Sequence, residues 1–172
     1  MNICKVLPLF FFLSTFISCT TTTDRSEAHS LQSMQMGQMQ RIHVCDGVLL
    51  SSQPDATQMR LARDDHGVKT VINLRLPAEG TNLREEKIAE ELGLAYHNLG
   101  YRAPETLTDD IFVEVRRILR NPDNRPVLMH CKSGNRAAAV WYAYRVLDQG
   151  VDPSRALQEA KKAGLRHPGH IT

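Results

Sequence analysis

The chain has 172 residues, a length that suits one domain with additional terminal segments. Its formal net charge is only +2, which excludes a global drive toward nucleic acid, so any anion site must be local. The four cysteines, at positions 4, 19, 45 and 131, have neither the spacing of a zinc site nor the density of a disulfide scaffold. We therefore expect a folded domain that needs no metal and no cofactor.

Residues 1–19 have the features of an export signal. Lys5 supplies a short positive region, and the apolar run 6–17 is too short to span a membrane. Ser18 before Cys19 resembles the end of a bacterial lipoprotein signal, in which Cys19 becomes the lipidated first residue. A soluble secreted protein and an uncleaved anchor are the alternatives. All three place the domain outside the cytoplasm, and lipidation would hold it to the membrane on the periplasmic side of the envelope.

Residues 20–40 are polar and show no helical or strand period, so we interpret them as a disordered tether. Met34, Met36 and Met39 could bind copper(I) through their thioethers, but a linker that happens to contain methionines is the simpler interpretation. The folded domain is expected over 41–166, and residues 167–172 are interpreted as a tail.

From Arg41 onwards the hydrophobic pattern alternates between strands and helices. Residues 41–45 and 48–52 flank the hairpin signal Asp46-Gly47. Further strands are predicted at 68–74, 94–99 and 127–130, and helices at 55–66, 82–92, 109–120, 137–147 and 153–163. Asn82 with Glu85 resembles a capping box. This order predicts an α/β fold with a mostly parallel central sheet of four to five strands, flanked by helices.

The predicted strands end in polar residues where such sheets bind ligands, at their carboxyl ends. Four ends are expected to lie together: Gln53, Arg75, Tyr101 and Cys131. We expect Gln53 and Arg75 to contribute to an anion site, although capping of a turn and simple solvation of a strand end explain these residues equally well.

The stretch 127–136 carries the strongest signal in the chain. An apolar strand ends in His130-Cys131, a small loop closes on Arg136, and an alanine-rich helix follows. The N–H groups of the loop would converge on an anion at the helix N-terminus, and Arg136 would add a bidentate fork. Both would favour the thiolate form of Cys131, which would then be a nucleophile beneath a bound oxyanion. The loop residues in question are Lys132, Ser133, Gly134 and Asn135.

Residues 41–165 resemble the cysteine-dependent protein phosphatases, and most of all the bacterial phosphatase-like domains associated with beta-lactamase-like hydrolases. The similar stretches are 50–54, 70–75, 91–96 and 127–136. The resemblance implies that Cys131 is the nucleophile, that Arg136 clamps the phosphate, that His130 supports the thiolate and that residues 132–135 form the cradle. It implies a tyrosine- or dual-specificity-like phosphatase acting on a phosphorylated protein or a small phosphoester, most simply as a monomer.

The sequence departs from the larger tyrosine and dual-specificity phosphatases in three respects. Four residues separate Cys131 from Arg136 where those families have five, and the shorter loop also matches rhodanese-type sulfurtransferases. Ala137 stands where a Ser or Thr usually aids breakdown of the phosphocysteine. The general acid is not fixed: Asp110 is our choice, but Glu105 and Asp109 lie in the same segment. A sulfurtransferase and a non-catalytic anion-binding envelope protein are therefore the alternatives.

Overall fold

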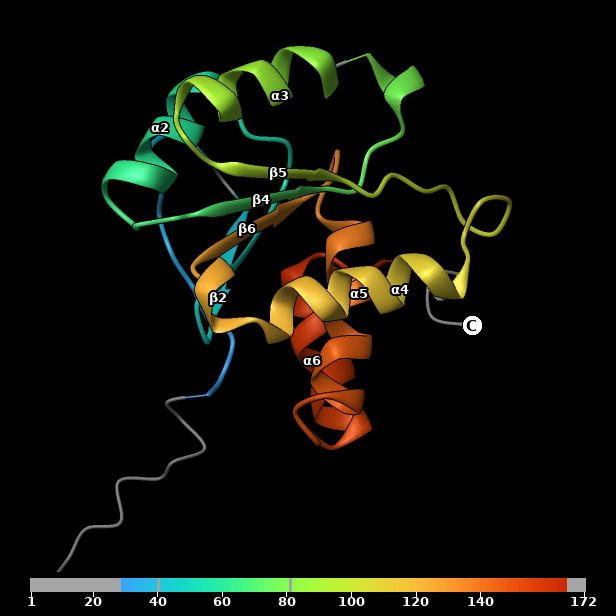
Figure 1. Cartoon of the computed structure of the whole chain (residues 1–172). Coiled ribbons are helices and arrows are strands. Elements are labelled where there is room, and N and C mark those ends of the chain that lie inside the picture. Colours follow the sequence, from blue (N-terminus) through green and yellow to red (C-terminus); the bar gives the residue numbers. More distant parts are fainter. Residues whose placement is uncertain (1–28, 40, 81, 167–172) are drawn as a thin grey trace, which may run out of the picture.

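A six-stranded sheet with helices on both faces forms the centre of the computed structural model, which describes residues 29–39, 41–80 and 82–166 (Figure 1). The strand order is β1-β2-β3-β6-β4-β5. β3, β6, β4 and β5 are parallel to one another, whereas β1 and β2 are joined by antiparallel pairing. The strands are β1 Gln32–Ser33, β2 Ile42–Cys45, β3 Val48–Ser51, β4 Thr70–Asn73, β5 Ala95–Asn98 and β6 Val127–His130. The predicted mostly parallel α/β sheet is confirmed, although it has six strands and is mixed.

Helices α2 and α3 cover one face of the sheet, and α4, α5 and α6 lie on the other (Figure 1). Their bounds are α2 Ala56–Asp64, α3 Asn82–Glu91, α4 Asp109–Arg120, α5 Asn135–Leu147 and α6 Pro153–Ala163, with short 3-10 helices at Pro77–Glu79 (η1) and Pro122–Asn124 (η2). No helix in the described part of the chain is long and apolar enough to cross a membrane.

The folded domain begins before Arg41, where the sequence suggested only a tether. β1 pairs with β2, and the backbone carbonyl of Leu31 accepts a hydrogen bond from the Lys162 ammonium at 3.1 Å. Met36 and Met39 are buried among core residues, so packing explains these methionines without a metal. The tether interpretation is therefore wrong for 29–39. The signal, Cys19 and the tail 167–172 lie outside the described residues.

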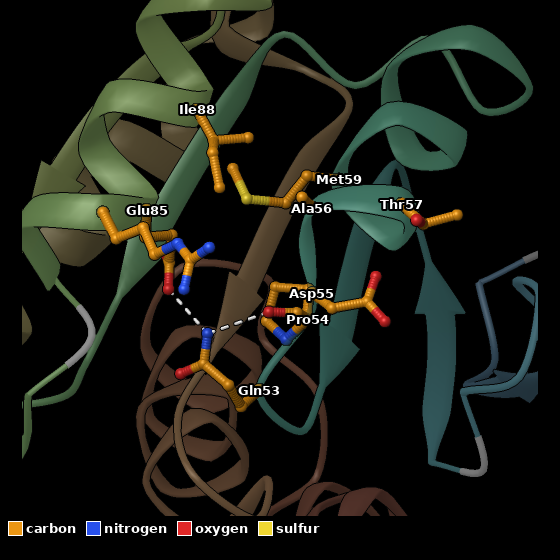
Figure 2. Close-up of a pocket in the computed structure, with 9 residues that line it drawn as sticks. Gln53, Pro54, Asp55, Ala56, Thr57, Met59, Glu85 and Ile88 are labelled. Carbon is orange, nitrogen blue, oxygen red and sulfur yellow. Dashed lines mark hydrogen bonds between the residues drawn. The ribbon is translucent and has the colours of Figure 1, made fainter.

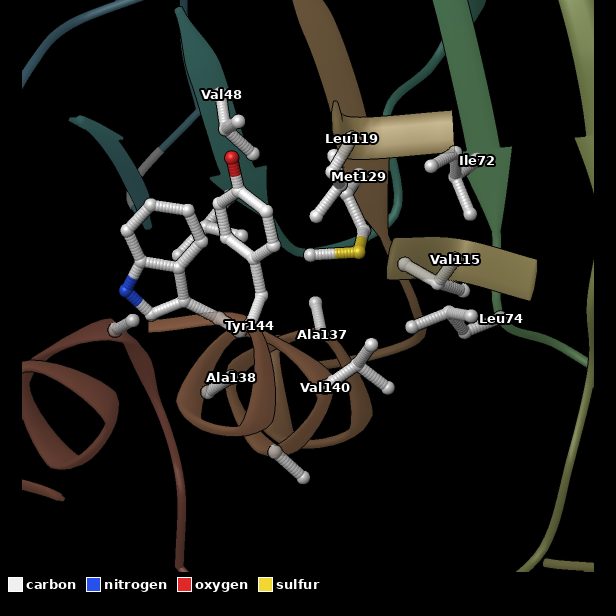
Figure 3. Packing of buried hydrophobic residues seen from close by; sticks show 14 of the residues in the cluster. Val48, Ile72, Leu74, Val115, Leu119, Met129, Ala137, Ala138, Val140 and Tyr144 are labelled. Carbon is white, nitrogen blue, oxygen red and sulfur yellow. The ribbon is translucent and has the colours of Figure 1, made fainter. Parts of the chain in front are cut away.

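Strand β6 supplies side chains to both hydrophobic cores. Val127 and Met129 pack toward α4 and α5, while Leu128 packs on the opposite face beside α2 and α3. A strand buried on both faces reads as a continuous apolar run, because its alternating side chains all meet a core. Figure 3 shows Met129 among Val115, Leu119 and Ala137 in the larger core. Both faces therefore hold β6 in place, and its carboxyl end carries His130 and Cys131.

Local capping fixes the starts of two helices as the sequence predicts. The carboxylate of Asp55 accepts the backbone N–H of Gln58 at 2.7 Å, and the side-chain oxygen of Gln58 accepts the backbone N–H of Asp55 at 2.9 Å. The carboxylate of Asp152 accepts the backbone N–H groups of Ser154 and Arg155 at the start of α6, with proline in the first turn. Glu85 was expected to cap its own helix, but its two carboxylate oxygens bind Gln53 and His130 in the interior instead. That deviation leads to the candidate site.

The connections of the sheet leave a crevice above the end of β6. The strands on either side, β3 and β4, continue into α2 and α3 on one face. β6 itself continues into α5 on the other face. Neighbouring strands whose helices turn to opposite faces form a topological switch point, the usual ligand position in open α/β sheets. The stretch singled out by sequence therefore lies where this topology provides room for a ligand.

Candidate active site

The loop between β6 and α5 folds around the sulfur of Cys131. The backbone N–H of Gly134 points to Cys131 Sγ at 3.2 Å, and α5 begins at the next residue, Asn135. Gly134 has φ +89°, and a Cβ there would lie 3.1 Å from the carbonyl oxygen of Ala163. Glycine is therefore required both by the backbone conformation and by the close approach of α6. The loop N–H groups and the helix N-terminus favour negative charge at this point.

The four loop residues named from the sequence follow the buried Cys131. Cys131 is 1% exposed, Lys132 is exposed, and Ser133 is half-buried. The side chain of Asn135 accepts the backbone N–H of Arg166 at 2.7 Å, which ties the loop to the segment after α6. Cys131 and Cys45 are both free thiols. Cys45 pairs with Val48 at the opposite end of the sheet from Cys131, and its burial raises its pKa to about 12.

Arg136 reaches over the loop and is held by a carboxylate that sequence reasoning did not identify. Its two terminal nitrogens bind the two oxygens of Glu79 at 2.7 and 2.9 Å. One of them also donates to the carbonyl of Tyr101 at 2.8 Å, and the Tyr101 hydroxyl donates back to the Arg136 carbonyl at 3.2 Å. Tyr101 is completely buried, so the guanidinium is fixed between β4, β5 and α5.

These contacts define the charge of the pair. Hydrogen bonding to Arg136 is the main reason why the pKa of Glu79 is lowered to about 2, against the opposing effect of burial. Burial disfavours the charged form of Arg136, but the bonds to Glu79 and the neighbouring sulfur of Cys131 outweigh it and raise its pKa. Burial also raises the pKa of Tyr101, which stays a neutral phenol. Glu79 and Arg136 are therefore both ionised near neutral pH.

Arg75 and Gln53 lie beside this pair and continue it as a chain of hydrogen bonds. Arg75 donates to a carboxylate oxygen of Glu79 at 3.3 Å and to its backbone carbonyl at 2.8 Å. Its third contact is with the side-chain oxygen of Gln53 at 2.7 Å. Arg75 is 7% exposed, so it is not a solvated strand end. The structure brings Arg75 and Gln53 to the site, where they contact protein groups.

The same chain of hydrogen bonds ends at a buried histidine, the residue before Cys131. The amide nitrogen of Gln53 donates to Glu85 at 2.6 Å, and the second oxygen of Glu85 lies 2.6 Å from His130 Nε2. His130 is fully buried and Glu85 is 4% exposed. Glu85 thus fixes the orientation of the residue before Cys131. The chain runs His130, Glu85, Gln53, Arg75, Glu79 and Arg136.

The acidic residues considered as general acids lie in the segment that follows Tyr101. Glu105 is exposed in the loop before α4, and Asp109 and Asp110 are exposed in its first turn. Asp109 lines a groove between α4 and α5 together with Phe112. Among the described residues, no group of three His, Cys, Asp or Glu side chains is arranged to hold a metal ion.

Two site residues, Glu79 and Glu85, were missed as site residues in the sequence. Glu79 follows the end of β4 by six residues, within the short helix η1, and a carboxylate so close to Arg75 is the signal that could have identified it. In the sequence, Glu85 has the pattern of a helix-capping residue. Only the tertiary fold brings it into contact with His130, which lies 45 positions later in the chain.

Comparison with known proteins places this fold among phosphatases. The chain is similar to the solved structure of TpbA from P. aeruginosa, a cysteine-to-serine variant in complex with pTyr, with 23% identity, a TM-score of 0.64 and coverage of 83% of this chain and 80% of that one. It is also similar to a putative phosphatase (DUF442) from Shewanella putrefaciens, with 22% identity, a TM-score of 0.60 and coverage of 81% and 82%.

A third similar structure is the catalytic core of Siw14, with 17% identity, a TM-score of 0.66 and coverage of 80% of this chain and 85% of that one. No protein-family model matches the sequence, and no curated protein matches it. The chain therefore has the fold of the cysteine-dependent, tyrosine-phosphatase-like enzymes, and the site described above lies on that fold.

Proposed function

We propose that this chain is a cysteine-dependent phosphomonoesterase. The observation that carries the proposal is the position of the Cys131 sulfur, which receives the Gly134 N–H at 3.2 Å at the start of α5, beside the ionised Arg136. An oxyanion above the sulfur would meet the loop N–H groups and one edge of the guanidinium. The similarity to a structure solved with pTyr supports a phosphorylated substrate, either a protein phosphotyrosine or a small phosphoester.

The reaction would proceed in two displacements. The Cys131 thiolate attacks phosphorus, a sulfur–phosphorus bond forms, and the bond from phosphorus to the ester oxygen breaks. Asp110 is our candidate to protonate the departing oxygen, with Glu105 as its alternative. Water then attacks the phosphocysteine and releases phosphate and the thiolate. Arg136 and the N–H groups of residues 132–135 stabilise the charge on the equatorial oxygens in both steps.

Glu79 and Glu85 would position the groups that react. Glu79 binds the end of the Arg136 guanidinium formed by its two terminal nitrogens, so it orients the fork and leaves the Nε side for the phosphoryl group. Glu85 fixes His130 and thereby the start of the loop. An arrangement held in advance avoids reorganisation when charge develops.

The loop of four residues between Cys131 and Arg136 keeps a sulfurtransferase as the second candidate, with Cys131 carrying a persulfide. A non-catalytic anion-binding protein is the third. We test these with residues 20–172, assayed with p-nitrophenyl phosphate, a phosphotyrosyl peptide, and thiosulfate plus cyanide. We expect phosphate release by the native sequence and none by Cys131→Ser. Thiocyanate formation in place of phosphate release would favour the sulfurtransferase, and inactivity in all three assays would favour anion binding alone.

We also propose that the enzyme is exported and held to the periplasmic side of a bacterial membrane through lipidation of Cys19. The support is the sequence of residues 1–19. A labelled fatty acid should enter the native protein and not Cys19→Ala. Release of both proteins into the soluble periplasmic fraction would contradict lipid anchoring and leave ordinary secretion.

A further inference from the structure

A pocket of about 600 Å³ lies between α2 and α3, beside the catalytic loop. Figure 2 shows Met59 of α2 and Ile88 of α3 at one end and Gln53 at the other. Gln53 belongs to both places, because its backbone N–H donates to the carbonyl of Lys132 at 3.4 Å while its side chain bonds Glu85. Gln53 therefore links one end of the pocket to the catalytic loop.

The topology explains why this pocket exists. β3 and β4 send α2 and α3 to one face of the sheet, while β6, which lies between them, sends α5 to the other face. No helix that follows β6 fills the space between the first turns of α2 and α3. This is the switch-point crevice in which open α/β sheets bind ligands. A substrate whose phosphate lies over Cys131 can extend into it.

The chemistry of the pocket favours an apolar occupant. The polar groups at its inner end already have partners: Glu85 bonds His130 and Gln53, and the amide of Gln53 also bonds Pro54 and Arg75. A satisfied polar group gains little from a new ligand, since a further bond would have to replace an existing one. The remaining contact surface includes apolar atoms of Pro54, Ala56, Met59 and Ile88. Asp55 and Arg84 carry opposite charges at its edge, so charge gives no net preference.

We propose that this pocket binds an apolar substituent on the leaving group of an aryl phosphomonoester. The proposal rests on the phosphatase function proposed above and names its substrate class. The leaving-group ring would lie over the catalytic loop, and its substituent would lie against Ala56 and Ile88, the partly exposed apolar residues of the lining. Removal of this substituent from water would then contribute to selection among phosphate esters.

A series of para-alkylphenyl phosphates tests the proposal, from phenyl to para-butylphenyl phosphate. A para-alkyl group hardly changes the acidity of the phenol, so the chemical step stays matched. Burial of each methylene predicts a rise in kcat/KM of about fourfold, expressed in KM while kcat stays constant. Ala56→Leu fills the pocket and should abolish the dependence on chain length. Arg60→Leu changes an exposed residue of the same helix that does not line the pocket, and it should retain the full dependence.

Binding measurements separate this proposal from the function on which it rests. The same esters are titrated calorimetrically into Cys131→Ser, with and without Ala56→Leu. If affinity rises with the length of the alkyl chain and Ala56→Leu removes that rise, the proposed pocket is supported. Absence of hydrolysis of any of these esters by the native protein would overturn the phosphatase function but not the pocket. Hydrolysis with equal kcat/KM across the series, or a dependence that Ala56→Leu leaves intact, would overturn the pocket alone.

Discussion

Glu79 and Arg136 form a two-bond ion pair, with the carboxylate oxygens 2.7 and 2.9 Å from the terminal nitrogens of the guanidinium. The carboxylate side chain is 19% exposed and the arginine side chain 12%. Because Arg75 binds the same carboxylate, one acid pairs with two arginines, and the group of three keeps a net positive charge beside the catalytic loop. The pair fixes the guanidinium before any phosphate arrives.

The lowered pKa of Glu79 predicts a dependence of stability on pH. The folded-state value is about 2 and the ordinary value is 4.5, so the carboxylate stabilises the fold fully above about pH 5. That contribution is lost as the pH falls toward 2, and Glu79→Gln should remove it, at a cost of roughly 1–3 kcal/mol at pH 7. The free energy of unfolding, measured with urea at a series of pH values from 7 to 2.5, should therefore fall less steeply for Glu79→Gln than for the native protein.

A control for this measurement is Glu114→Gln. Glu114 pairs with Arg117 on the exposed surface of α4, where water screens the ion pair and its contribution to stability is small. Equal effects of the two substitutions would show that the Glu79 pair has no special weight in stability.

Replacement of Arg136 by lysine tests the fork. Lysine keeps the positive charge but loses the planar fork, whose two terminal nitrogens bind Glu79 and whose Nε side would bind the phosphoryl group. We expect kcat/KM for p-nitrophenyl phosphate to fall at least about 10²-fold, equivalent to roughly 2.7 kcal/mol. Steady-state kinetics of Arg136→Lys measure this fall in kcat/KM. Activity close to that of the native protein would exclude Arg136 as the residue that binds the phosphoryl group.

Gly100 lies where β5 passes closest to the arginine network. A Cβ at this position would lie 2.2 Å from the carbonyl oxygen of Arg75 and 2.7 Å from the Leu76 nitrogen, so the backbone would have to move. We expect Gly100→Ala to destabilise the fold by about 1–3 kcal/mol or more. Gly93→Ala is the comparison, because its Cβ would meet nothing and only its positive φ costs about 1 kcal/mol. In thermal unfolding, the midpoint temperature of Gly100→Ala should be clearly lower than that of Gly93→Ala.

The choice between Asp110 and Glu105 can be made with two substrates that differ in their leaving groups. The variant that removes the acid should be strongly impaired on phenyl phosphate, whose phenolate needs a proton. It should be much less impaired on p-nitrophenyl phosphate, whose leaving group does not. Asp110→Asn is expected to show this difference. A similar loss on both substrates would remove Asp110 from the mechanism, and Glu105→Gln is the matched comparison.

The sequence predicts the sheet and the catalytic loop because their signals are local. The apolar run into Cys131, the glycine that α6 approaches and the following helix are all contained in residues 127–147. The early start of the domain was missed because β1 has two residues, and its stability comes from pairing with β2 and from buried methionines.

The network around the loop could not be read from the sequence because it depends on register between strands. Ser51 and Asn73 both lie opposite His130, on either side of β6. The residues two positions farther on, Gln53 and Arg75, are therefore brought together beside the loop although 22 positions separate them. Glu85 and Glu79 join from α3 and η1, at sequence distances of 45 and 57 from their partners. No spacing rule within one element predicts such a set.

Direct detection of the covalent intermediate tests the central claim most closely. The native protein is mixed with p-nitrophenyl phosphate, quenched within milliseconds, and digested for peptide mass spectrometry. We predict a phosphoryl group on the peptide that contains Cys131 and none on the same peptide of Cys131→Ser. The lifetime of the phosphocysteine should be long, because Ala137 replaces the Ser or Thr that usually aids its breakdown. Phosphate release without any modification of Cys131, or equal release by Cys131→Ser, would contradict a phosphatase that uses this cysteine.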